Sequence, residues 1–314
     1  MKPKFSGHDT FPLRYGWLYK AVNLLINNSK NAKSSDDFVR DAIVSLGVGK
    51  NMVNAIRYWA EMTDVISSSL VNSRSQLAVT DLGNFLFKED ASYGNADPYL
   101  EKTGSIWLLH YRLNASIDFL TSYRYFFNYC NFQSFEKPKL VDEIMSSTIS
   151  LTNMEVGKKS TVKKDVDCFL HTYSKKTRQS KAVDEDHFAS PLSELGLITE
   201  VSGGFCVSEL TERPSLPTEI FAYALCRFVG NETAESGVNT IDFDSLLSKP
   251  CSPGRIFRLS EQGLSNKLDD LASISNGKVS WTDSLGLRQI MVDPFLKKFP
   301  AQFLDDYYGD GYVY

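Results

Sequence analysis

The chain has 314 residues, of which 42% are hydrophobic and 23% charged, as in a soluble globular protein with two or three domains. Its formal net charge of −4 excludes a protein coated in positive charge, so any contact with nucleic acid must use local basic patches. Five widely spaced cysteines without a C-x-x-C pair, and four scattered histidines, give no recognisable zinc site and favour a reducing cytoplasm.

The N-terminal segment, residues 5–17, lacks an apolar run long enough for a signal peptide, and no later run approaches a membrane span. We therefore predict a cytoplasmic protein without membrane contact. His8 beside Asp9 is the most compact acid–base pair of the chain, and it suggests a catalytic site that handles a proton. Tyr15 is then the candidate nucleophile and Arg14 the candidate phosphate clamp. The alternative is a structural segment docked on the core, because adjacent residues do not point at one target.

Residues 36–66 predict two short amphipathic helices joined by a tight glycine turn at residues 46–49. This is the helix-turn-helix pattern, whose second helix can enter a DNA major groove. Tyr58 and Glu61 fall on the polar face of the second helix, together with four residues that can pair with base edges or phosphates. These predicted DNA contacts are Lys50, Asn51, Asn54 and Arg57.

A strand at residues 77–80 and a short helix at residues 81–87 follow, and they complete the pattern of a winged helix. Winged helices also mediate protein contacts, so a packing module is the alternative. Further along, the aromatic-rich stretch at residues 119–135 predicts a buried helical hub between domains. His110, on a strongly apolar helix face, is interpreted as a core histidine.

Residues 158–181 hold eight basic residues against two acidic ones, a local charge of +6 in a chain of net −4. The basic residues are Lys158, Lys159, Lys163, Lys164, Lys175, Lys176, Arg178 and Lys181. A short helix and a hairpin with a two-glycine turn follow at residues 188–207, which suggests a second winged module. Its predicted DNA contacts are Lys163, Lys164 and Lys175. A solvated charged loop is the alternative.

In the last third, Ser252-Pro253-Gly254-Arg255 could hold a phosphate at a helix start, with Arg255 as the cation. An amphipathic helix through residues 264–271 and paired strands at residues 279–282 and 287–292 suggest a third helix-plus-hairpin unit. The predicted fold is mainly α with small β-hairpins (α+β), built from tandem winged helix-turn-helix modules around a helical hub. The predicted parts are residues 1–95, 96–150, 151–235 and 236–314.

Several of these segments resemble a bacterial family labelled as a domain of unknown function. Residues 5–17 resemble its N-terminal signature, which usually has Glu where this chain has Asp9, and residues 46–59 resemble its second motif. Shorter matches follow in order along the chain. They are Trp107-Leu108-Leu109-His110, Ser190-Pro191-Leu192, Leu195-Gly196-Leu197-Ile198 and Ser252-Pro253-Gly254-Arg255.

The best-described members of that family are the SspB-type DNA nickases of single-strand DNA phosphorothioation systems, which act against phage. The resemblance implies double-stranded DNA, a cysteine desulfurase, an enzyme resembling PAPS reductase and an ATPase as partners. It implies no catalytic residues, and the chain shows no recognised nuclease signature. If the protein is a nickase, a divalent metal such as Mg²⁺ or Mn²⁺ is the expected cofactor. The alternatives are a DNA-binding adaptor without catalysis, which positions the sulfur-transfer machinery, and a transcriptional regulator.

Overall fold

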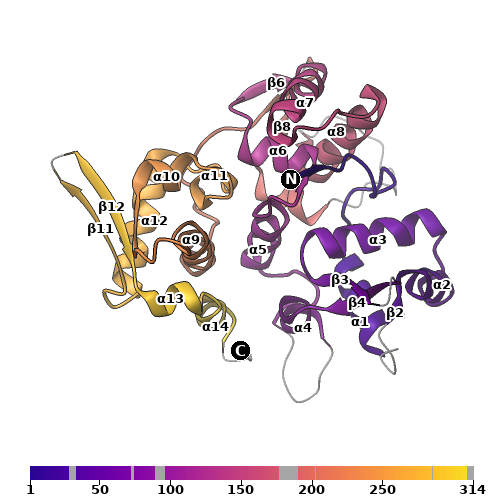
Figure 1. Cartoon of the computed structure of the whole chain (residues 1–314), viewed down its shortest axis with the longest axis horizontal. Helices are drawn as coiled ribbons and strands as arrows, with labels where there is room; N and C mark the ends of the chain where they lie inside the picture. The colour runs from indigo at the N-terminus through magenta and orange to yellow at the C-terminus, as the bar shows by residue number, and fades with distance from the viewer. Residues whose placement is uncertain are drawn as a thin grey trace. The chain divides into compact units, whose positions relative to one another are not determined.

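The structure, a computed structural model, describes residues 1–27, 33–71, 74–88, 96–176, 190–201, 203–284 and 286–309. The fold is α+β, with many helices and small sheets (Figure 1). The chain forms two compact units. The first comprises residues 1–113, 118–123 and 134–208, and the second comprises residues 114–117, 124–133 and 209–314. The four parts predicted from the sequence stay a prediction.

The N-terminal part of the first unit places three helices beside a three-stranded sheet of order β2-β4-β3 (Figure 1). The helices are α1 (Trp17–Asn27), α2 (Ser35–Leu46) and α3 (Lys50–Met62). The strands are β2 (Lys33–Ser34), β3 (Ile66–Val71) and β4 (Arg74–Val79), all antiparallel, and α4 (Asp81–Phe87) follows. The helices, the strand and the short helix predicted here are confirmed as elements.

Local chemistry explains the turn between α2 and α3. The Ser34 hydroxyl accepts a hydrogen bond from the Asp37 amide and so caps the start of α2. Gly47 ends α2 in the left-handed conformation, with φ of 63°, which a residue without Cβ adopts at no steric cost. On α3, Val53, Ile56 and Trp59 are buried at helical spacing, which fixes the opposite face outward.

The remainder of the first unit contains helices and a four-stranded sheet of order β6-β9-β8-β7. The helices are α5 (Thr103–Asn114), α7 (Lys137–Thr152), α8 (Lys159–Tyr173) and the 3₁₀ helix η1 (Pro191–Leu195). The strands are β6 (Ser134–Glu136), β7 (Ser174–Lys176), β8 (Ile198–Glu200) and β9 (Phe205–Val207). The predicted hairpin is therefore confirmed, but β7 pairs in parallel with β8. The side chains of Arg178 and Lys181 lie outside the described residues.

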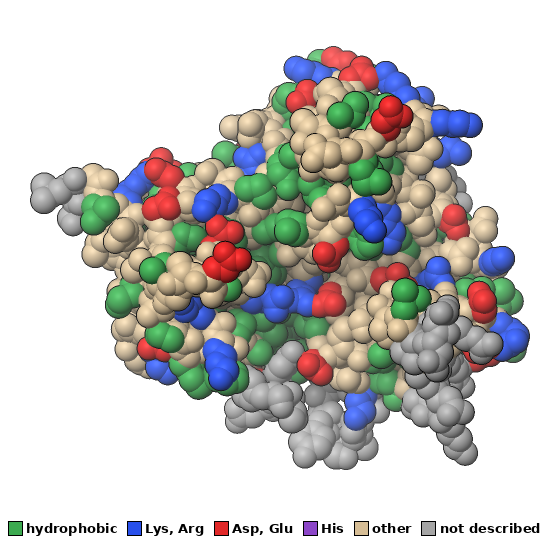
Figure 2. Space-filling model, in the orientation of Figure 1, with side chains coloured by type: hydrophobic (Ala, Val, Ile, Leu, Met, Phe, Trp, Pro, Cys, Tyr) green, Lys and Arg blue, Asp and Glu red, His purple; other side chains and the backbone are tan. Residues whose placement is uncertain are grey.

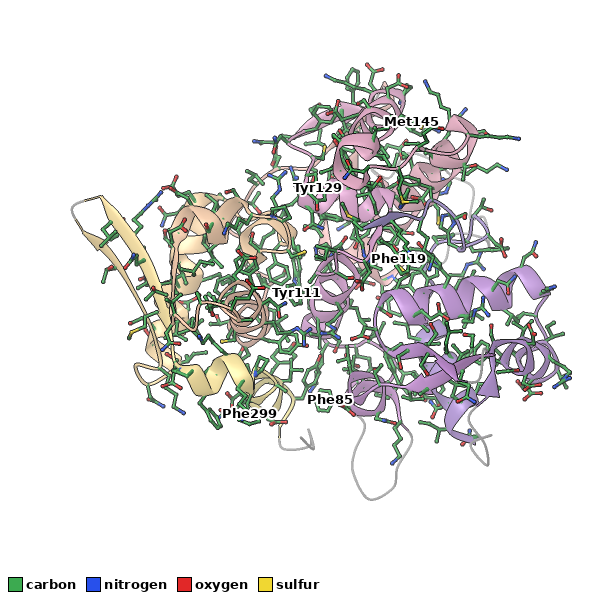
Figure 3. The ribbon with its side chains drawn as sticks, viewed as in Figure 1. Phe85, Tyr111, Phe119, Tyr129, Met145 and Phe299 are labelled. Atoms are coloured by element: carbon green, nitrogen blue, oxygen red, sulfur yellow. The ribbon has the colours of Figure 1, made fainter. Side chains whose placement is uncertain are left out.

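The helical stretch predicted over residues 119–135 is helical only in part. The segment contains β5 (Phe119–Leu120), α6 (Ser122–Asn128) and β6, and β5 pairs in parallel with β1 (Lys2–Pro3). Its aromatic composition indicates burial correctly, since Tyr123, Phe126 and Phe127 are buried. The strand pairings come from partners more than sixty residues away, which local composition does not reveal. Phe119 marks β5 and Tyr111 marks α5 in Figure 3.

The second unit combines helices with a three-stranded antiparallel sheet of order β10-β12-β11. The strands are β10 (Thr240–Asp242), β11 (Val279–Ser284) and β12 (Leu287–Val292), and the last two are the predicted pair. The helices are α9 (Thr218–Glu232), α10 (Phe243–Ser248), α11 (Pro253–Ile256), α12 (Glu261–Ile274), α13 (Pro294–Lys298) and α14 (Gln302–Tyr308).

Three expectations about composition can be checked on the described residues. None of their helices is both long and apolar enough to cross a membrane. All five cysteines are free thiols, and four of them are buried. His110 is fully buried and its Nδ1 lies 2.8 Å from the Tyr173 hydroxyl, so it is the core histidine that its apolar surroundings predicted.

Candidate nucleic-acid interface

The outer face of α3 presents polar side chains beside a shallow groove. Lys50 and Asn51 are exposed, and Asn54 and Arg57 are partly exposed. The groove has a volume of about 570 Å³ and runs between α2 and α3, with Lys50, Asn54 and Arg57 among its lining residues. The helix thus carries donors that suit phosphates and base edges on its solvent side.

Two of these four residues also hold the fold. The Asn54 amide donates to the Asp9 carboxylate at 3.3 Å, and the Arg57 guanidinium contacts Ser35 Oγ and lies 3.7 Å from Glu61. Lys50 and Asn51 therefore remain the more available pair. Lys and Arg are interspersed with Asp and Glu over the surface seen in Figure 2.

The predicted outward position of Tyr58 is wrong. Tyr58 is buried, and its hydroxyl lies 2.8 Å from that of Tyr123. The backbone at Gly7 passes directly over the ring, so close that a Cβ there would lie 2.7 Å from it. Burial raises the pKa of Tyr58 well above its ordinary value. The N-terminal segment therefore covers this part of α3, which helical periodicity alone does not show.

His8 does not pair with Asp9 through its side chain, so the predicted acid–base pair is wrong. His8 is 3% exposed and its Nε2 lies 2.7 Å from the Asp165 carboxylate on α8. The Thr10 amide donates to Nδ1 at 3.0 Å, so the hydrogen-bond network places the proton on Nε2, which donates to Asp165. The other Asp165 oxygen accepts from the Ser122 amide at 2.8 Å. This buried network holds the N-terminal segment to α8, whereas Asp9 is exposed.

Tyr15 lies at the surface, away from the buried His8. Its hydroxyl donates to Glu194 at 2.5 Å. Partial burial, and then the neighbouring carboxylate, raise the pKa of Tyr15, which disfavours the phenolate that a nucleophile needs. The structure therefore separates the three predicted catalytic residues: His8 is buried, Asp9 faces Asn54 and Tyr15 faces Glu194. Their catalytic roles stay predictions.

A cavity of about 1110 Å³ lies in the first unit, and five separate stretches of chain line it. Arg14 lines it from the N-terminal segment, where its guanidinium lies 6.0 Å from the Phe11 ring centroid and 5.7 Å from that of Trp17. Lys175 lines it from β7, and Glu194 from η1. The sequence predicted Arg14 and Lys175 as contacts, but not that they share a cavity, because 161 residues separate them in the chain (175 − 14).

The other predicted basic contacts of this unit point elsewhere. Lys163 and Lys164 are exposed on α8 and do not line the cavity. Lys137, which does line it, forms an ion pair with Asp167 at 2.6 Å. Among the described residues, neither Arg14 nor Lys175 has a carboxylate within ion-pair distance, so these are the cations available to a ligand.

The guanidinium of Arg255, predicted to contact a phosphate, already donates hydrogen bonds to neighbouring residues. Its Nε and Nη2 donate to the carbonyls of Asn128 and Cys130 at 3.0 and 3.1 Å. Its Nη1 donates to Asn131 Oδ1 at 2.9 Å. The short helix α11 is already capped, because Ser252 Oγ accepts from the Arg255 amide. Arg255 therefore ties α11 to the chain that follows α6.

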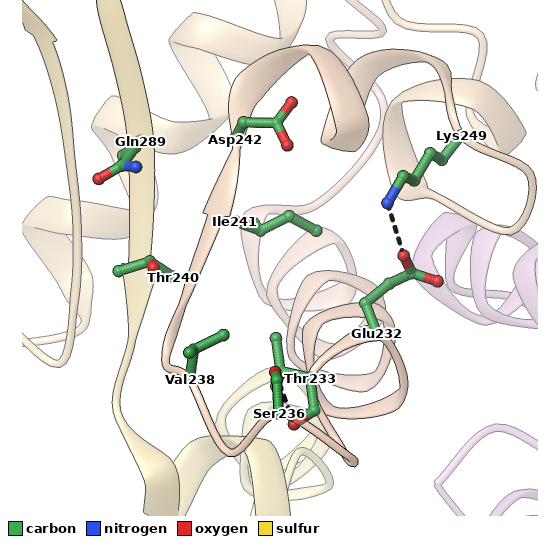
Figure 4. A pocket seen from close by; sticks show the side chains of 9 residues that line it. All are labelled: Glu232, Thr233, Ser236, Val238, Thr240, Ile241, Asp242, Lys249 and Gln289. Atoms are coloured by element: carbon green, nitrogen blue, oxygen red, sulfur yellow. Dashed lines mark hydrogen bonds and ion pairs between the residues drawn. The ribbon is translucent and has the colours of Figure 1, made fainter.

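The second unit contains a smaller pocket, of about 310 Å³, shown in Figure 4. Its charged groups are engaged: Lys249 Nζ lies 2.9 Å from Glu232, and the Asp242 carboxylate accepts from the amide and hydroxyl of Ser245. In the described part of the chain, no three His, Cys, Asp or Glu side chains are grouped so that they could hold a metal ion.

The comparison with known proteins decides the family. Residues 5–308 match the family described as "Protein of unknown function (DUF4007)". The chain belongs to this DUF4007 family. It is also similar to a magnesium ion-bound SspB crystal structure, with 30% sequence identity and a TM-score of 0.81. A second SspB crystal structure gives the same identity and a TM-score of 0.79.

Each alignment with SspB covers 96% of this chain and 87% of the other chain. None of the curated proteins matches this chain. The family resemblance read from residues 5–17 and 46–59 is thereby confirmed for nearly the whole chain. No local pattern in the sequence indicates Asp165 as the partner of His8, because 157 positions separate them. It did single out Ser190, through the Ser190-Pro191-Leu192 match, but without a role.

Proposed function

We propose that this DUF4007 protein is the DNA-binding component of a bacterial DNA phosphorothioation system. The similarity to SspB supports the system. The exposed face of α3, with Lys50 and Asn51, is the observation that supports DNA contact. In this proposal α2 and α3 form a helix-turn-helix, the β3–β4 hairpin is its wing, and the protein acts in the cytoplasm beside the sulfur-transfer enzymes.

A gel-shift titration with a labelled duplex tests DNA contact by α3. Lys50→Ala/Asn51→Ala removes two exposed side chains that hold no described element together. We expect at least about a tenfold loss of affinity and a salt slope smaller by about one. Lys20→Ala, an exposed lysine on α1, is the matched control and should bind as wild type does. Equal affinities for the double variant and wild type would exclude this face of α3 as a DNA contact.

Single-strand nicking is the second part of the proposal, and it is supported by the similarity to SspB. A magnesium ion is bound in one of the SspB structures. The described residues of this chain form no group of three ligands, so they do not build a metal centre by themselves. Mg²⁺ in DNA-acting enzymes commonly uses one or two carboxylates with phosphate and water.

A supercoiled-plasmid assay with Mg²⁺, Mn²⁺ or EDTA separates nickase from adaptor. Metal-dependent open circles support the nickase. An intact plasmid with a salt-sensitive gel shift supports the non-catalytic adaptor, which the separation of His8, Asp9 and Tyr15 favours. Asp9→Asn and Tyr15→Phe test the predicted catalytic residues without touching the buried network. Nicking at wild-type rates in both variants would remove these two residues from the mechanism.

A further inference from the structure

The cavity of the first unit contains two hydroxyls that the fold does not use. Ser190 is 2% exposed, and its Oγ has no hydrogen-bond partner among the described residues. Ser174 Oγ is also buried and without a partner there, and both residues line the cavity. A buried hydroxyl without a partner costs about 1–3 kcal/mol, so such groups usually serve a ligand or water.

The position of Ser190 strengthens this point. It stands at the N-cap of η1, where a serine hydroxyl normally accepts a hydrogen bond from a helix amide. Here the side chain makes no capping bond, and the Ser190 carbonyl accepts from the amide and hydroxyl of Ser193 instead. The fold therefore leaves the Ser190 hydroxyl available to whatever occupies the cavity.

The charges around the cavity define the chemistry of its ligand. Arg14 and Lys175 are cations without a carboxylate partner among the described residues, so they suit an anionic group such as phosphate. Glu194 is held in place by the Tyr15 hydroxyl and keeps a second carboxylate oxygen as an acceptor. Carboxylates accept from the exocyclic amino groups of bases. A ligand with a phosphate and an amino group would pair with both the cations and the Glu194 carboxylate.

The volume and the lining residues of the cavity further restrict the class of ligand. A volume of about 1110 Å³ is much larger than a phosphate ion needs and lies at the upper end of small-molecule sites. Pro12, Pro138 and Leu170 contribute apolar surface to the lining, which suits a flat ring. We propose that this cavity binds a single nucleotide with an amino-bearing base, with Arg14, Lys175, Ser174 and Ser190 as contacts for the phosphate and sugar and Glu194 as the acceptor for the amino group of the base.

The nucleotide can be free or can belong to a DNA strand, and the second source rests on the proposed DNA binding. The N-terminal segment links the two places, since Asp9 contacts Asn54 on α3 and Arg14, five residues later, lines the cavity. A strand bound at α3 could therefore deliver one extruded nucleotide, at a cost of a few kcal/mol for unstacking.

Isothermal titration calorimetry with dCMP, dTMP, deoxycytidine and inorganic phosphate tests the cavity. We expect dCMP to bind, and deoxycytidine, dTMP and phosphate to bind more weakly. Arg14→Gln and Lys175→Gln should each weaken dCMP by about tenfold, the size of one charge-assisted hydrogen bond. Lys163→Gln, an exposed lysine of α8 outside the cavity, should bind as wild type does. No dCMP binding, or phosphate bound as tightly as dCMP, would overturn the proposal.

Ser190→Ala separates a ligand role from a structural one. Removal of an unpaired buried hydroxyl should leave the melting temperature unchanged or raise it, while dCMP affinity falls. A lower melting temperature with unchanged affinity would mean that Ser190 serves the fold, and would remove it from the site.

A duplex with one 2-aminopurine distinguishes the two sources. Fluorescence that rises on binding in wild type but not in Arg14→Gln, with the gel shift kept, assigns the cavity to a strand nucleotide. Binding of dCMP without that rise assigns it to a free nucleotide. If dCMP binds but no duplex does, the proposed DNA binding is wrong and nucleotide binding in the cavity is supported. If the duplex shifts through Lys50 and Asn51 but dCMP does not bind, nucleotide binding in the cavity is wrong and the proposed DNA binding is supported.

Discussion

Three arginines of the second unit and Lys50 of the first unit differ in what their N–H groups already bind. In the second unit, Arg213 and Arg258 are buried and Arg255 is partly buried, and all three donate to backbone carbonyls. Burial lowers the pKa of Arg213 and of Arg258 to about 10. In the first unit, Lys50 is exposed. A basic residue is therefore a candidate ligand contact only where the fold leaves its donors unused.

The largest loss of stability should come from removing the hydrogen bonds that Arg255 donates to backbone carbonyls in the second unit. Arg255→Ala leaves the carbonyls of Asn128 and Cys130 without this donor, and we expect a loss of about 2–4 kcal/mol in the free energy of unfolding. Urea denaturation followed by circular dichroism measures it. Arg40→Ala, an exposed arginine whose ion-pair partner among the described residues is Asp37, is the control and should change the free energy of unfolding by less than about 0.5 kcal/mol. Equal losses of stability in Arg255→Ala and Arg40→Ala would show that the hydrogen bonds of Arg255 to carbonyls do not stabilise the fold.

The His8–Asp165 pair shows that the first unit also buries polar groups for structure. We expect His8→Ala and Asp165→Asn each to lower the free energy of unfolding by about 2–3 kcal/mol, because each leaves a buried partner unpaired. The double variant should lose clearly less than the sum of the two single losses. Additive losses would mean that the two side chains do not act as one unit.

A smaller effect is expected on α3, where the partly exposed Glu61 lies beside Arg57. Burial raises the pKa of Glu61, while Arg57 and then Lys4 lower it, and the net shift is upward. The ionised form is therefore disfavoured on folding, so its contribution to stability is full below the unfolded pKa and is lost as pH rises through the folded pKa. Glu61→Gln should gain stability relative to wild type between pH 4 and pH 7, by less than about 1 kcal/mol. A melting-temperature difference that does not change with pH would contradict this.

The smallest structural consequence concerns the thiols. Burial raises the pKa of Cys226 to about 12 and that of Cys251 to about 11. Since the thiolate is the reactive form, iodoacetamide at pH 8 should label both at least about a hundredfold more slowly in the folded protein than in urea. Peptide mass spectrometry over time measures the rates. Labelling of Cys251 at the unfolded rate would show that its surroundings open readily.

The side chains of residues 5–17 have very different surroundings, although they are close in sequence. The sequence identified this segment as unusual but could not say which side chains point inward. Structure placed His8 in a buried network, Asp9 and Tyr15 at the surface, and Arg14 at a cavity. Neighbours in an irregular segment have no fixed periodicity, so sequence adjacency does not predict a shared target.

The sequence by itself determined the elements whose signals are local. Apolar spacing located α2, α3 and α12, Gly47 located the turn, and the long motifs at residues 5–17 and 46–59 identified the family. Only the tertiary structure decided the partners of the polar residues. His8 meets Asp165 across 157 positions and Arg255 meets Asn128 across 127, while the cavity gathers five stretches of chain. Helical and strand periodicity records which side of an element is buried, but it does not record what that side will meet.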